Sequence, residues 1–133
     1  MNPEMEDSND KITSFSVSTH KTNNETYSML KLQPQDGIMN ADFSPKIRKD
    51  INAYFCEKKY KGSGTTKHVL DMSDVNYMDQ DGLESILLIN RMSRYLKYDK
   101  ISLINCKDDI KIKLEEKHLY EYVNIKKDVS ELI

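Results

Sequence analysis

The sequence contains no tryptophan, only two cysteines and no long run of apolar residues. A membrane-spanning helix needs about 20 consecutive apolar residues, so we expect no membrane span. The N-terminus also lacks a basic stretch followed by an apolar one, so we expect no secretion signal. Cys56 and Cys106 lie in apolar or strand-like contexts, which predicts two buried free thiols in a cytoplasmic protein instead of a disulfide or a metal pair.

Basic residues are not in excess. The formal net charge is −2 over 133 residues, which gives no support to nucleic-acid binding, because that function usually needs a concentrated basic face. The acids are unevenly spread: the first ten residues include Glu4, Glu6, Asp7 and Asp10, and no lysine or arginine. We predict that residues 1–11 form a disordered acidic tail and that residues 12–133 form a single domain.

Groups that carry catalysis or bind metals are not clustered either. The three histidines are scattered, without the short spacing of a zinc site. A calcium loop would need a glutamate six residues after Gly82, but that position is Leu88. No nucleophile lies near a base, and no carboxylate pair is placed for acid–base work. We therefore predict a protein that is not an enzyme and that has no metal or cofactor.

Alternating and helical patterns divide the remaining sequence. Residues 14–19 and 27–32 alternate as the two strands of a hairpin. Ser44 and Pro45 predict a helix start, with Ser44 as the N-cap and proline at the first helical position. Later segments alternate between strand and helix: 69–72, 83–96, 101–104, 108–117 and 122–125. This order predicts an α/β fold, a mixed and mostly parallel sheet with helices packed on it, preceded by the N-terminal hairpin.

Residues 68–89 join a buried strand to a helix through an acidic turn. The order of apolar strand, Asp71, Met78-Asp79 and Gly82-Leu83 resembles the STAS domain family, which includes the bacterial anti-sigma-factor antagonists. Many members have glycine where His118 stands, and if His118 must adopt a left-handed backbone there, this costs conformational energy that glycine would not lose.

The resemblance extends from about Tyr27 to Ile125 and implies a regulatory protein-binding module. In the regulated members a partner kinase phosphorylates the first hydroxyl residue of the turn, and this modification releases the sigma-factor inhibitor. Gln80 stands at that phosphoacceptor position here, so the hydroxyl is absent. Asp81 either mimics the modified state or, like Asp79, serves only as a helix N-cap or first-turn acid.

The helix after the turn is apolar on all sides at residues 86–89, which indicates either packing on a neighbouring helix or an exposed binding patch. We predict that a partner binds this turn and helix through Asp79, Gln80, Asp81, Gly82, Leu83, Ile86 and Leu87. Gly82→Arg or Asp81→Lys is expected to abolish that binding while leaving the domain folded.

The predicted partner is an anti-sigma factor with a kinase fold. One alternative within the family is a STAS subunit of a lipid-transport ABC system or of a stress-signalling assembly. A further alternative is a response-regulator receiver domain phosphorylated on Asp71, although the spacing from Asp71 to Gly82 is too long for that family. A homodimer is possible, and the sequence leaves the oligomeric state open.

Overall fold

The computed structural model describes residues 14–21, 25–61 and 67–132. The predicted tail at residues 1–11 lies outside this part of the chain. The elements in order are β1 (Phe15–Lys21), β2 (Thr26–Leu32), η2 (Gln35–Gly37), β3 (Ile38–Met39), α2 (Ser44–Lys61), β4 (Lys67–Asp71), β5 (Tyr77–Met78), α3 (Gln80–Tyr95), β6 (Ser102–Ile104), α4 (Asp108–Glu116), η3 (Leu119–Glu121), β7 (Asn124–Ile125) and η4 (Val129–Leu132).

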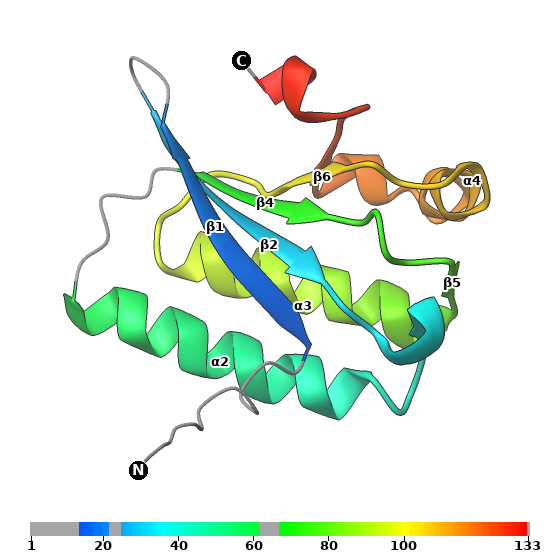
Figure 1. Cartoon of the computed structure of the whole chain (residues 1–133), viewed down its shortest axis with the longest axis horizontal. Helices are drawn as coiled ribbons and strands as arrows, with labels where there is room; N and C mark the ends of the chain where they lie inside the picture. Colours follow the sequence, from blue (N-terminus) through cyan, green and yellow to red (C-terminus); the bar gives the residue numbers. More distant parts are fainter. Residues whose placement is uncertain (1–13, 22–24, 62–66, 133) are drawn as a thin grey trace, which may run out of the picture.

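The main sheet has five strands in the order β1-β2-β4-β6-β7. β1 pairs with β2 as an antiparallel hairpin, and every later pair is parallel. Because parallel crossovers are right-handed and the strands follow chain order, successive helices fall on the same face of the sheet. Figure 1 shows α2 and α3 side by side beneath that face. The predicted mixed, mostly parallel α/β fold is therefore confirmed.

Alternation along β2 separates two apolar clusters. Leu30 and Leu32 belong to the main core between the sheet and the helices, while Tyr27 and Met29 point to the other face. On that other face the Tyr27 hydroxyl donates to the Leu132 carbonyl at 2.6 Å. The C-terminal turn η4 therefore covers the face opposite α2 and α3 (Figure 1).

The helices fill the main core at helical spacing. α2 buries Ile47, Ile51 and Phe55, as its sequence period predicts, and α3 buries Ile86 and Ile89. α4 closes the same core at its far end with two residues four apart: Ile110 and Leu114.

The start of α2 differs from the prediction. Ser44 is the first helical residue and not the N-cap, and the turn before it is held by Asn40, whose side-chain oxygen accepts from the Asp42 and Phe43 amides. The Ser44 hydroxyl instead lies 3.3 Å from the Asp81 carbonyl oxygen and 3.1 Å from the Ser85 hydroxyl. It joins the starts of α2 and α3, a role that only the packed helices define.

The last predicted strand is shorter than expected. β7 contains only Asn124 and Ile125, because the preceding residues form the η3 turn and the Tyr122 amide donates to the Leu119 carbonyl at 2.8 Å. His118 has φ 58° and ψ 31°, so it adopts the left-handed backbone that glycine takes at lower cost.

Candidate partner-binding site

A second, two-stranded sheet holds the acidic turn in place. β3 pairs in parallel with β5, and the Asp79 amide donates to the Met39 carbonyl at 3.1 Å. No sequence pattern indicates this sheet, because a two-residue strand is too short to display a period. We expected the turn to be a loop. Backbone hydrogen bonds instead anchor it to residues 37–39, which precede α2 in the sequence.

Asp79 caps the helix. Its backbone is extended, and its carboxylate accepts from the Gly82 amide at 3.1 Å. α3 therefore begins at Gln80, three residues earlier than the sequence pattern indicated. The prediction that Asp79 serves as a helix N-cap is confirmed. Its carboxylate stabilises the start of α3.

Gly82 is a close-approach position. A Cβ atom built there would lie 2.7 Å from the Met39 carbonyl oxygen and 2.6 Å from Cγ of Met78. The first contact is with backbone, which cannot rotate away. The expectation that Gly82→Arg leaves the domain folded is therefore wrong, because any side chain at this position would push α3 away from β3.

Gln80 and Asp81 are the exposed residues of the first helical turn. The Gln80 amide nitrogen donates to the Glu84 carboxylate at 3.3 Å, so Glu84 belongs to the same surface although the sequence reasoning missed it. Within the described part of the chain, the Asp81 carboxylate makes no hydrogen bond or ion pair. Its own backbone carbonyl accepts from the Ser85 hydroxyl at 3.0 Å, which fixes the turn beneath the free acid.

The other predicted contact residues are placed differently. Gly82, Leu83 and Ile86 are buried, with Leu83 only 2% exposed, so their side chains are not available to a partner in the folded state. Leu87 is half-buried and packs against the main core. The accessible surface is therefore narrower than predicted, and the buried residues support it from below.

Two further residues border this surface. Tyr77, in β5, is 52% exposed, and the Lys113 ammonium lies 5.1 Å from the centre of its ring. Lys113 also donates to the Met78 carbonyl at 2.6 Å, which ties α4 to β5. Neither residue had a sequence signal, because the contact joins elements distant in the chain. We define the α3-start surface as Tyr77, Gln80, Asp81 and Glu84, with the half-buried Asp79, Leu87 and Lys113 at its border.

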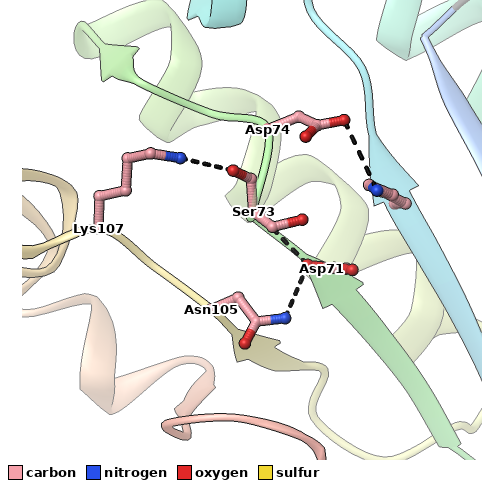
Figure 2. Close-up of polar contacts among 6 residues, drawn as sticks. Asp71, Ser73, Asp74, Asn105 and Lys107 are labelled. Atoms are coloured by element: carbon pink, nitrogen blue, oxygen red, sulfur yellow. Dashed lines mark hydrogen bonds and ion pairs between the residues drawn. The ribbon is translucent and has the colours of Figure 1, made fainter.

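Asp71 lies in a separate polar cluster at the carboxyl ends of β4 and β6 (Figure 2). One of its carboxylate oxygens accepts from the Ser73 amide and from the Asn105 side chain, both at 3.0 Å. The Lys107 ammonium donates to the Ser73 carbonyl at 2.5 Å. These contacts tie the ends of two neighbouring strands together, so Asp71 has a structural role.

The sheet order excludes the receiver alternative. A doubly wound receiver sheet has the order 2-1-3-4-5, with its first strand inside and helices on both faces. Here the first strand is an edge strand in an antiparallel hairpin, and the later strands follow chain order.

Among residues 14–21, 25–61 and 67–132 no group of three or more histidine, cysteine, aspartate or glutamate residues could hold a metal ion. None of the helices in these ranges has the length and apolar character to cross a membrane.

Comparison with known proteins gives one family and a set of similar folds. No curated protein matches the chain. SpoIIAA, an anti-sigma factor antagonist of Bacillus, is 13% identical in its unphosphorylated form, with a TM-score of 0.56 over 87% of this chain and 92% of that one. An anti-sigma-factor antagonist domain protein from Planctomyces limnophilus is 11% identical, with a TM-score of 0.65 over the same shares of the two chains.

The same fold also occurs inside a much larger protein. A murine Solute Carrier 26 anion transporter, member A9, is 10% identical over 88% of this chain, with a TM-score of 0.62, but only 21% of the transporter is covered. At these identities the likeness concerns the fold, which hosts different functions. The family model of the STAS domain matches residues 24–132. The chain therefore belongs to the STAS domain family.

Proposed function

We propose that the protein is a non-catalytic regulatory module of the cytoplasm that binds an anti-sigma factor of the kinase-fold class through the α3-start surface. Family membership and the anti-sigma-factor antagonists among similar structures support a regulatory protein partner. Similarity of fold alone does not identify that partner, so the proposal depends on the surface itself.

The observation that carries the proposal is a free carboxylate on a rigid support. Asp81 is exposed and unpaired among the described residues, while its backbone is bonded to Ser85 and lies beside Ser44. Aromatic side chains are enriched at protein interfaces, and Tyr77 supplies an exposed aromatic ring on the same surface. Little conformational entropy is lost when such a preformed surface binds.

The negative charge of this surface is permanent. The N-terminus of a helix favours negative charge, because its first amides are unpaired and the helix dipole is positive there. In phosphorylated members of the family that charge is added to a hydroxyl, whereas Gln80 offers none. We propose that the Asp81 carboxylate is an attractive contact for the partner and that, because Gln80 offers no hydroxyl, no phosphate is added at that position to release the partner.

Charge reversal tests the proposal. Asp81→Lys should remove the partner from the complex captured from the native host, because it replaces an attractive charge by a repulsive one at the centre of the surface. The measurement is affinity capture with quantitative mass spectrometry, followed by titration of the purified partner against each variant. Loss of affinity by at least about tenfold, or 1.4 kcal/mol, is expected.

Asp109→Lys is the matched control. Asp109 is also an exposed acid in the first turn of a helix, α4, so it has the same effect on net charge and a similar effect on helix stability. It should capture the partner like wild type. If Asp81→Lys retains the same partner with unchanged affinity, the α3-start surface is not the binding site. If the captured partner has no kinase fold, the proposed class of partner is wrong, but the proposed location of the binding site is not contradicted.

A further inference from the structure

A groove runs between α2 and α3 on the side away from the sheet. It consists of two hollows, of about 300 and 560 Å³, which share Asn52 and Met92. Leu88, Met92, Tyr95 and Leu96 contribute its apolar surface, and Tyr95 is 76% exposed. Met92 and Leu96 also pack against the main core, whereas Leu88 and Tyr95 are not among the residues that pack there.

The rim of this groove is basic. Arg48 and Lys49 of α2 and Arg91 of α3 are exposed and line the hollows. Across the described ranges, none of the three makes an ion pair. An apolar groove with three unpaired cations favours an occupant that carries both acidic and apolar side chains.

Residues 1–13 of the same chain have this composition. They contain four acids and one lysine, a net charge of −3, together with the apolar residues Met1, Met5 and Ile12. The segment joins the fold next to α2, because the Ser14 amide and hydroxyl both donate to the Asp50 carboxylate, at 3.2 and 2.5 Å. Thirteen residues can extend over about 43 Å, whereas a helix is about 10–12 Å across.

We infer that residues 1–13 bind in the groove between α2 and α3, with their acids against Arg48, Lys49 and Arg91 and a methionine on the apolar surface. Tethering at Ser14 gives the segment an effective concentration in the millimolar range, so weak contacts suffice. A second copy fits the groove less well, since a twofold contact through this face would bring its basic rim close to the same cations of the other copy. The inference is independent of the α3-start surface.

Paramagnetic broadening tests the inference in the full-length chain. A nitroxide is placed at Ser8→Cys, in a background where Cys56 and Cys106 are replaced by serine. Amide signals of residues 48–56 and 88–96 should lose intensity at low salt and recover at high salt, because exposed charges are screened. The variant Arg48→Gln/Lys49→Gln/Arg91→Gln should abolish the broadening.

A matched variant neutralises three exposed lysines elsewhere: Lys111→Gln, Lys117→Gln and Lys126→Gln. This variant has the same change in net charge and should retain the broadening. The comparison therefore distinguishes binding in the groove from nonspecific electrostatic attraction to the protein. Broadening around Ser14 and Asp50 without any at residues 88–96 of α3 would overturn the inference, and so would broadening that survives neutralisation of the groove. Broadening of an unlabelled, isotope-enriched chain by a labelled one would show that a second copy is the occupant instead.

Discussion

At the residue scale, three consecutive polar residues at the start of α3 have different tasks. Asp79 is used by the fold, since its carboxylate accepts from the Gly82 amide. Gln80 and Asp81 face solvent, one bonded to Glu84 and the other without a side-chain partner in the described part of the chain. The sequence alone could not show which of these residues caps the helix and which face solvent, because polar residues of these types occur both at the N-cap and in the first turn.

The position of Gln80 predicts a gain of function. Gln80→Ser places a hydroxyl on the exposed first residue of α3, where the helix terminus favours a phosphate. With ATP and the kinase-fold partner captured by wild type, this variant should gain one phosphate group and then release the partner. Intact-mass spectrometry measures the modification, and the wild type should gain no phosphate at this position.

Glu84→Ser is the control for this experiment, because Glu84 is exposed on the same face one turn later. It should stay unmodified, since its amide lies inside the helix. If Gln80→Ser still binds the partner but is never phosphorylated, Gln80 is not at the phosphoacceptor position.

At the scale of elements, the approach of α3 to β3 determines where the site lies. α3 can pack this closely only because position 82 lacks a Cβ atom. The apolar segment at residues 86–89 is mostly internal: Ile86 and Ile89 are fully buried, and Leu87 packs on the core. Packing against the sheet and α2 therefore explains why residues 86–89 are apolar on most sides of the helix. Of these four residues, only Leu88 lines the outer groove.

Gly82→Ala tests this packing. In an exposed helix the change would stabilise by up to about 1 kcal/mol. Here the new methyl group would meet the Met39 carbonyl, so we expect a loss of about 1–3 kcal/mol in the free energy of unfolding, as in overpacked cores. Urea denaturation followed by circular dichroism measures it.

Glu84→Ala, two residues later on the exposed side, should change the free energy of unfolding by less than about 0.5 kcal/mol. Equal or greater stability of Gly82→Ala relative to wild type would mean that β3 and α3 are not in contact as described.

At the scale of the whole molecule, two titratable side chains, Tyr54 and Cys106, pack against the main core. Tyr54, His68 and Phe55 pack edge to face beneath the sheet, and the Tyr54 hydroxyl lies 2.9 Å from His68 Nε2. Burial raises the pKa of Tyr54 from 10.0 to about 12 and that of the Cys106 thiol from 9.0 to about 11.

These shifts predict destabilisation by alkali. Both folded-state pKa values exceed the unfolded ones, so the stability is complete below pH 9 and is lost as the pH rises from about 9 to 12. Urea midpoints measured from pH 8 to 11 should fall. Cys106→Ala should flatten the fall between pH 9 and 11. Cys56→Ala should not, because Cys56 is exposed and the prediction that both thiols are buried is wrong for it. Identical pH profiles for the two variants would show that the Cys106 thiol is not buried in solution.

The sequence by itself determined the order of the main strands and helices and the buried face of α2. Those features depend on side-chain period and local backbone preference, which neighbouring residues define. The tertiary structure alone decided the β3–β5 sheet, the role of Ser44 between two helices and which residues of 79–87 reach solvent. These depend on contacts between segments far apart in the chain, such as Met39 with Gly82, and local sequence does not encode such distances.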